Sequence, residues 1–201
     1  MLTIPNMLTF SRILAIPLFV IIFYLPFQWS YGVAAIIFIV AGVTDWFDGY
    51  LARRLNQVSK LGAFLDPVAD KLMVAVALVL LVEMHATVWL ALPALVMVSR
   101  EILVSALREW MAECGQRAAV AVSYIGKVKT VVQMISISML LAIKPTFGDD
   151  GGLLFIGTEL LAYLLLYVAL VLTLWSMFIY LKAAWPNLIE ASVIDPASQG
   201  K

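Results

Sequence analysis

Residues 153–182 read LLFIGTELLAYLLLYVALVLTLWSMFIYLK, and Glu159 is the only charged residue in this stretch before Lys182. A membrane-spanning helix needs about 20 predominantly apolar residues, so this segment is long enough to cross a bilayer. The rest of the 201-residue chain has the same character, since 64% of its residues are hydrophobic and only 13% are charged. A soluble domain is nearer half apolar and a quarter charged. The composition therefore excludes a soluble protein.

Six apolar stretches are separated by polar or turn-forming residues. They are expected at 7–25, 31–53, 66–83, 87–111, 123–143 and 153–182. This pattern predicts an all-α polytopic membrane protein with six transmembrane helices and a short interfacial segment at its N-terminus. No cleavable leader is expected, because no basic residue precedes the first apolar run. We expect one membrane domain over residues 1–182 and a cytoplasmic tail over residues 183–201.

The basic residues are distributed unequally between the connections, which predicts the orientation of the chain. The connections 53–60 and 113–129 hold Arg53, Arg54, Lys60, Arg117, Lys127 and Lys129. The loops on the opposite side hold only Lys144. Because basic loops stay in the cytoplasm, we expect both termini and the basic connections to lie there. His85 falls in an opposite loop, where we expect it to be solvated.

Four carboxylates lie in or beside the second and third apolar stretches, where charge is costly and usually functional. The pairs Asp45 with Asp48 and Asp66 with Asp70 are three and four residues apart, so each pair shares one helix face. Converging carboxylates repel unless cations neutralise them. Oxygen ligands without His or Cys favour Mg²⁺ or Mn²⁺, and a pair of such ions suits displacement at phosphorus. An alternative for Asp66, which precedes Pro67, is a helix N-cap.

Small residues accompany these carboxylates. Gly49, Ala52 and Gly62 would let a nucleotide approach the backbone, and Arg53 supplies a cation for its phosphate. Taken alone, the small residues would fit equally well with close packing of membrane helices.

The combined spacing carries a family resemblance. The segment Asp45-Trp-Phe-Asp48-Gly49-Tyr-Leu-Ala52-Arg53, followed by Gly62, Asp66 and Asp70, resembles the signature of the CDP-alcohol phosphotransferase family. Further segments resemble the members of that family that use glycerol 3-phosphate as acceptor, over nearly the whole chain to Lys182. These segments are Pro5-Asn6-Met-Leu-Thr9-Phe-Ser-Arg12, Phe64-Leu-Asp-Pro-Val-Ala-Asp-Lys71, Arg100-Glu101-Ile102, Leu107-Arg108-Glu109-Trp110 and Ile125-Gly126-Lys127-Val-Lys129-Thr130.

The resemblance implies a reaction and a set of roles. The phosphatidyl group of CDP-diacylglycerol would pass to glycerol 3-phosphate with release of CMP, at a cytoplasmic site of the bacterial inner membrane. Asp45, Asp48 and Asp66 would hold two Mg²⁺ or Mn²⁺ ions, and Asp70 would share one and act as general base. The residues expected to contact CDP-diacylglycerol are Asn6, Thr9, Gly49, Ala52, Arg53 and Gly62. A homodimer surrounded by membrane lipids is expected, and no nucleic-acid partner.

Asn6, Thr9 and Arg12 form one polar stripe at i, i+3 and i+6. Without the resemblance, this stripe would fit an interfacial helix start equally well.

A second group of charges indicates where the acceptor binds. Arg100 and Arg108 are eight residues apart, about two helical turns, and Arg100 follows a mostly apolar run. A cation that deep requires an anionic partner, and the phosphate of glycerol 3-phosphate would serve. We expect that phosphate to contact Arg100, Arg108, Lys127 and Lys129. The alternative is that these side chains extend to the membrane surface, with Glu101 and Glu109 as partners.

Two other functions remain open at this point. Within the same family, the acceptor would instead be inositol phosphate, serine or a second lipid. From another class, intramembrane carboxylates are typical of cation transporters. All four carboxylates lie near one side of the membrane, however, and no charges continue across the other half.

Overall fold

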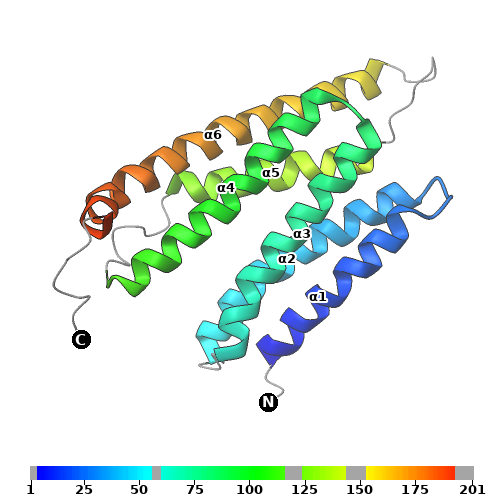
Figure 1. The fold of residues 1–201 in the computed structure, drawn as a ribbon. Helices are drawn as coiled ribbons and strands as arrows, with labels where there is room; N and C mark the ends of the chain where they lie inside the picture. Colours follow the sequence, from blue (N-terminus) through cyan, green and yellow to red (C-terminus); the bar gives the residue numbers. More distant parts are fainter. Residues whose placement is uncertain (1–3, 56–59, 116–123, 144–152, 193–201) are drawn as a thin grey trace.

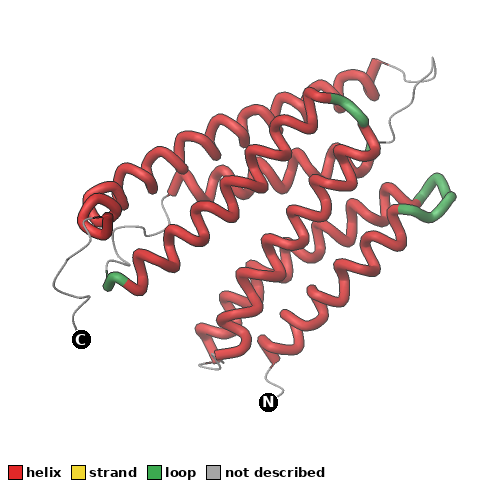
Figure 2. The backbone as a smooth tube through the Cα atoms, viewed as in Figure 1, coloured by secondary structure: helices red, strands yellow, loops and turns green. Residues whose placement is uncertain are grey.

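The computed structural model describes residues 4–55, 60–115, 124–143 and 153–192. Within its helices, side chains are described except at residues 4–9, 45–55, 60–64, 66–67, 124, 153–155 and 190–192. The described chain is helical and contains no strand, as Figure 2 shows. The predicted all-α class is therefore confirmed.

The described residues form six helices that run up and down, so that consecutive helices are antiparallel and α1 begins at the end of the bundle where α6 stops (Figure 1). Their bounds are α1 Ile4–Phe23, α2 Ser30–Leu55, α3 Lys60–His85, α4 Val88–Glu113, α5 Tyr124–Ala142 and α6 Leu153–Ser192. Each helix corresponds to one of the six predicted apolar stretches, with different end residues.

The helices pack as two groups of three. α1 packs against α2 and α3, while α6 packs against α5 and α4. Contacts of α2 and α3 with α5, and of α3 with α4, join the two groups. The two groups are therefore in direct contact through α2, α3, α4 and α5.

Aromatic and small residues fill the centre of the bundle. Phe19 and Phe38 are fully buried, with ring centroids 6.4 Å apart. A methyl group on Gly42 would lie 2.1 Å from Cε of Met134, so α2 and α5 approach closely at this glycine. Such small-residue contacts let membrane helices pack without a hydrophobic driving force between them.

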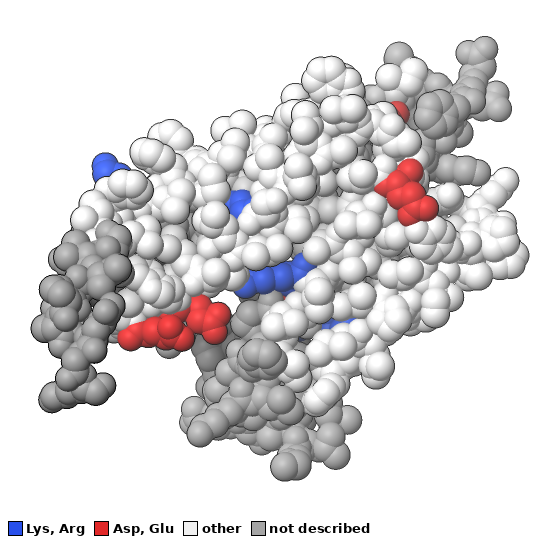
Figure 3. All heavy atoms as spheres, in the orientation of Figure 1, with Lys and Arg blue, Asp and Glu red and all other residues white. Residues whose placement is uncertain are grey.

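The outer surface is apolar, as a lipid-facing surface must be. Leu14, Val88 and Leu160 are each about two-thirds exposed, and Figure 3 shows few charged side chains on the face in view. Three helical segments are long and apolar enough to cross a bilayer: Val88–Glu113, Ile125–Ala142 and Ile156–Ile189. Phe10–Phe23 and Ser30–Thr44 are shorter apolar segments. The described residues thus give a membrane protein with three clear spans, and six spans remain a prediction.

Two helices extend beyond the predicted stretches. α3 begins at Lys60, so Asp66 and Pro67 lie inside it, and the alternative that Asp66 caps the helix is wrong. α6 continues through Pro186 to Ser192, past the predicted start of the tail at residue 183. In this extension, Ala184 packs with Met111 of α4 in a small buried cluster.

At the bundle end opposite the start of α1, polar contacts join the helix ends. The Tyr24 hydroxyl donates to the Glu83 carboxylate, and the Tyr163 hydroxyl lies 3.3 Å from Nδ1 of His85. The expectation that His85 is solvated is wrong, since only 3% of it is exposed. Its ring packs edge-on against Tyr163. This burial lowers the pKa of His85 below its usual value, because the charged imidazolium loses its water.

Candidate active site

A cavity of about 130 Å³ lies among α3, α4, α5 and α6, and we call it the basic cavity. It is lined by Lys71, Arg100, Glu101, Val104, Ser105, Arg108, Gly126, Lys129, Thr130 and Tyr180. Four of these residues are basic and one is acidic, so the lining carries three net positive charges. Such a cavity is suited to an anion with more than one negative charge.

Arg100 is the most extensively held of these cations. Only 7% of it is exposed. Its Nη2 donates to Oγ of Ser176 at 2.7 Å, and its Nη1 donates to Glu101 at 3.2 Å. The guanidinium carbon lies 5.8 Å from the ring centre of Tyr180. Its buried Nε has no hydrogen-bond partner among the described residues, so one donor of a fixed cation is left for a ligand.

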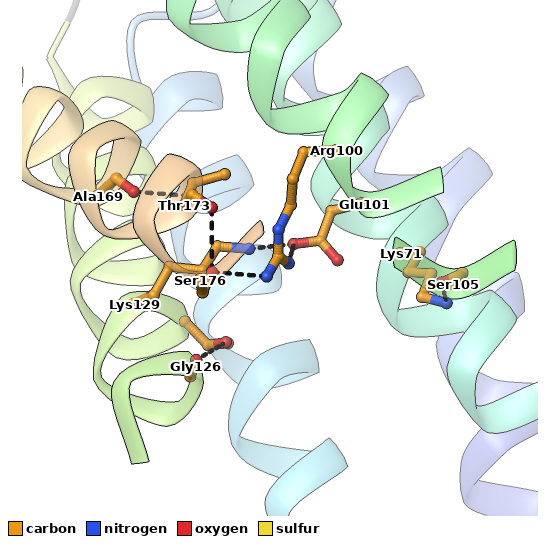
Figure 4. A network of polar contacts seen from close by, with 10 residues as sticks. Lys71, Arg100, Glu101, Ser105, Gly126, Lys129, Ala169, Thr173 and Ser176 are labelled. Carbon is orange, nitrogen blue, oxygen red and sulfur yellow. Dashed lines mark hydrogen bonds and ion pairs between the residues drawn. The ribbon is translucent and has the colours of Figure 1, made fainter. Parts of the chain in front are cut away.

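Ser176 is itself oriented by the helix that carries it. Its hydroxyl donates to the carbonyl of Thr173 at 3.0 Å, within α6 (Figure 4). The oxygen that receives Arg100 is therefore fixed by backbone geometry. The Thr173 hydroxyl likewise donates to the carbonyl of Ala169 at 2.6 Å, so both hydroxyls are satisfied although both residues are fully buried.

Glu101 lies between two cations from different helices. Its Oε1 accepts from Nη1 of Arg100 on α4 and from Nζ of Lys129 on α5 (Figure 4). Lys129 is 2% exposed, whereas Glu101 is 28% exposed. The carboxylate therefore compensates two buried charges while remaining open to the cavity.

Sequence reasoning missed the contribution of α3 to this cavity. Nζ of Lys71 donates to Oγ of Ser105 on α4, which joins the two groups of helices (Figure 4). The available signal was the position of Lys71 directly after Asp70, the last carboxylate of the motif.

The structure separates the four predicted acceptor-binding residues. Arg100, Arg108 and Lys129 line the basic cavity, whereas Lys127 is exposed and is not among its lining residues. Residues two apart on a helix point in nearly opposite directions, at about 200°. Lys127 and Lys129 therefore do not face the same cavity.

Asp70 faces a second, smaller cavity among α1, α2, α3 and α5. Arg12 and Asp70 both line it, beside Gly42 and Met134. Arg12 is 3% exposed, so the polar stripe predicted at the start of α1 reaches the interior at this residue. Asp70 and Lys71 are neighbours in α3, and they face two cavities that share α3 and α5 as walls.

The other predicted motif residues lie in helices, but their side chains are outside the described part of the structure. Asp45, Asp48, Gly49, Ala52 and Arg53 are in α2, Gly62 and Asp66 are in α3, and Asn6 and Thr9 are in α1. The helical backbone puts Asp45 and Asp48 about one turn apart in α2. α2 also contacts α3, which carries Asp66 and Asp70.

The predicted metal site lies mostly outside the described side chains. Among the described side chains, no three His, Cys, Asp or Glu residues come together, and Asp70 is the only one of the four motif carboxylates in that set. The donor set itself consists only of carboxylates, which Mg²⁺ and Mn²⁺ prefer. The helical backbone of both segments supports the predicted pairing on two contacting helices.

Comparison with known proteins places the chain in a family. Residues 2–175 match the model of the CDP-alcohol phosphatidyltransferase family. The chain belongs to this family. The match confirms the resemblance predicted from the motif in α2 and α3, and it includes both cavities except for Tyr180.

Curated relatives of this phosphatidyltransferase are similar over nearly their full length. A protein of Yersinia pestis (strain Pestoides F) is 56% identical over 189 residues, which are 94% of this chain and 98% of the relative. A Yersinia enterocolitica protein has the same identity and coverage. A protein of Salmonella paratyphi A is 53% identical over 187 residues, 93% of this chain and 97% of its own. All three are named CDP-diacylglycerol--glycerol-3-phosphate 3-phosphatidyltransferase.

Proposed function

We propose that this protein transfers the phosphatidyl group of CDP-diacylglycerol to glycerol 3-phosphate, giving phosphatidylglycerophosphate and CMP. The observation that carries the proposal is the basic cavity beside Asp70. The names of relatives more than half identical to this chain support the same two substrates.

The basic cavity is proposed to bind the phosphate of the acceptor. A phosphate dianion balances most of the three net positive charges of the lining. One of its oxygens would accept from the Nε of Arg100, which no described residue satisfies. Leaving a buried donor unpaired costs about 1–3 kcal/mol, so filling it favours binding of the ligand. Arg108 would add a charge-assisted contact from the exposed side of the cavity.

The reaction requires a base near the acceptor hydroxyl, and Asp70 is the proposed base. Asp70 and Lys71 are adjacent in α3, with Cα atoms about 3.8 Å apart, but they line different cavities. In this proposal, an acceptor whose phosphate lies in the basic cavity extends its glycerol hydroxyls toward the smaller cavity that Asp70 lines. The hydroxyl oxygen forms a bond to the lipid-side phosphorus of CDP-diacylglycerol, and its proton passes to Asp70. The bond from that phosphorus to the oxygen of CMP breaks, and CMP leaves with the electron pair.

Asp45, Asp48 and Asp66, with Asp70, would hold Mg²⁺ or Mn²⁺, and such ions stabilise the charge that develops on phosphate oxygens. The donor side of the site would include Asn6, Thr9, Gly49, Ala52, Arg53 and Gly62. The small residues among them would leave room for the nucleotide beside α2 and α3.

The proposal includes a location for the enzyme. The distribution of basic residues favours six spans with both termini and the active site on the cytoplasmic side of a bacterial inner membrane. Acyl chains of the donor would then remain in the bilayer while glycerol 3-phosphate arrives from water. A homodimer is part of the same proposal, because the family resemblance implies one.

A CMP-release assay on the purified protein tests the proposed function. CDP-diacylglycerol is supplied with glycerol 3-phosphate, inositol phosphate, serine or glycerol, with and without Mg²⁺ or Mn²⁺. Among the four acceptors, we expect only glycerol 3-phosphate to support metal-dependent CMP release. Equal CMP release with serine or glycerol would contradict a phosphate-binding cavity. No CMP release with any of the four acceptors would favour the alternative that the protein is a cation transporter.

A further inference from the structure

Glu101 is a carboxylate in a cavity that is otherwise built for an anion. It lines the basic cavity together with four cations, and it is 28% exposed. A negative charge at this position repels an incoming phosphate, because like charges at close range cost binding free energy. Attraction of the acceptor therefore does not explain Glu101.

The cations that Glu101 contacts explain its presence. Arg100 and Lys129 are 7% and 2% exposed, and both donate to the same carboxylate oxygen. A buried charge without a partner is strongly destabilising. When no acceptor is bound, Glu101 accepts a hydrogen bond from both cations, and Asp70 adds a weaker electrostatic attraction on Lys129.

We propose that Glu101 is a resident counter-ion whose partners, Arg100 and Lys129, are taken over by the acceptor's phosphate on binding. This inference rests on the proposed function of the basic cavity. Glu101 acts through these two cations, so it is a positioning residue. Its own exposure allows the carboxylate to turn toward water once the phosphate has replaced it, while Ser176 continues to hold Nη2 of Arg100.

The exchange sets an upper limit on the affinity for phosphate. Every phosphate that binds must displace an ion pair already formed, and every product that leaves allows that pair to form again. Removal of the Glu101 charge should therefore tighten binding of the anion and destabilise the empty protein. Slower release of the phosphate-bearing product should then lower kcat together with KM.

The test compares the purified full-length protein with Glu101→Gln and with the matched control Glu109→Gln, which lies about two turns further along α4 on an exposed position. Binding of glycerol 3-phosphate is measured by calorimetry without CDP-diacylglycerol, and the melting temperature is measured with and without the ligand. We expect Glu101→Gln to bind about tenfold more tightly. It should melt lower than wild type when empty and recover most of this difference at saturating glycerol 3-phosphate. Glu109→Gln should match wild type in both measurements.

A second pair of variants keeps the test decisive if Glu101→Gln alone does not fold. Lys129→Gln should weaken binding, because it removes a cation and leaves the Glu101 charge beside the phosphate. The double variant Lys129→Gln/Glu101→Gln should bind glycerol 3-phosphate more tightly than Lys129→Gln. Since the two residues contact each other, this non-additivity isolates the effect of the carboxylate.

The outcomes separate this inference from the function it rests on. The counter-ion role is overturned if wild type binds glycerol 3-phosphate, but Glu101→Gln binds it no more tightly than wild type and the double variant no more tightly than Lys129→Gln. The proposed phosphate-binding function of the basic cavity would then remain. If wild type does not bind glycerol 3-phosphate at all, the proposed function of the cavity fails as well.

Discussion

The two ends of the bundle both gather polar side chains, but they use them differently. At the end where α3 meets α4, Tyr24 pairs with Glu83, Tyr163 contacts His85, and Tyr167 donates to the carbonyl of Trp89 at 3.0 Å. We call this group the tyrosine end. Its hydroxyls bridge one helix end to another. In the basic cavity, cations outnumber the single carboxylate, and a buried Arg100 donor is unsatisfied by the described residues.

This contrast shows which polar groups in a membrane protein indicate a ligand. Unpaired polar atoms occur at both ends, because Nε2 of His85 and Oγ1 of Thr87 are also buried without a hydrogen-bond partner among the described residues. The excess of positive charge in the basic cavity is therefore what distinguishes the two ends. An excess of buried cations that face a cavity costs desolvation free energy, which a bound anion offsets. Variants at the two ends should therefore affect different measurements.

The largest effect is expected next to the basic cavity. Asp70→Asn should reduce CMP release by more than about a hundredfold, because a general base typically contributes 10²–10⁴-fold. Binding of glycerol 3-phosphate, measured by calorimetry, should be retained, since the basic cavity does not include Asp70. A variant that keeps more than a tenth of the wild-type rate would exclude Asp70 as the base.

Within the basic cavity, Arg108→Ala should raise the KM for glycerol 3-phosphate about ten- to a hundredfold, the equivalent of a charge-assisted hydrogen bond. The KM for CDP-diacylglycerol should change little, and Arg108→Lys should recover part of the loss because it restores the charge but not the forked geometry. Steady-state kinetics with each substrate varied in turn provides the measurement. An unchanged KM for glycerol 3-phosphate would instead favour an arginine that only extends to the membrane surface.

At the tyrosine end, Tyr163→Phe should lower the melting temperature by about 2–4 °C, as expected for one hydrogen bond in a protein of this size. Both KM values and kcat should match wild type. If this variant changed the KM for glycerol 3-phosphate, the two ends would be coupled and the contrast between them would be lost.

The smallest effect concerns the pH dependence of stability at the tyrosine end. Burial lowers the pKa of His85 in the folded protein below its usual value near 6.5. The unfolded chain therefore takes up a proton at a higher pH than the folded protein does. His85 should contribute stability above about pH 6.5 and lose it as the pH falls further. Melting temperatures at pH 7.5 and 5.5 should differ slightly more for wild type than for His85→Phe, and a smaller wild-type difference would contradict this sign.

The fold was largely predictable because lipid imposes a simple rule on the sequence. Each predicted apolar stretch became a helix. The start of the third stretch, predicted at residue 66, has a local cause: Asp66 followed by Pro67 is typical of a helix start, yet both lie within α3, which begins at Lys60. His85 was misplaced because a histidine in a short loop is usually hydrated, whereas here Tyr163 from α6 packs against its ring.

The candidate site was predictable only where its residues follow helical spacing. Arg100 and Arg108 could be paired from their separation of eight residues, and both line the basic cavity. Lys71 and Ser105 are 34 residues apart, and Arg100 and Ser176 are 76 apart. Those contacts depend on how α3, α4 and α6 pack, which no local pattern encodes. Lys127 and Lys129 were predicted together because the motif contains both, although a helix turns them to different sides.

The contact between Arg100 and Ser176 also constrains how the protein is made. Arg100 lies near the middle of α4, where an arginine costs about 2.5–3.5 kcal/mol to insert. Ser176 belongs to α6, which leaves the ribosome after α4 and α5. Glu101 is on the same helix as Arg100 and enters the bilayer with it. The arrival of α6 thus completes the polar interior of a helix inserted two spans earlier.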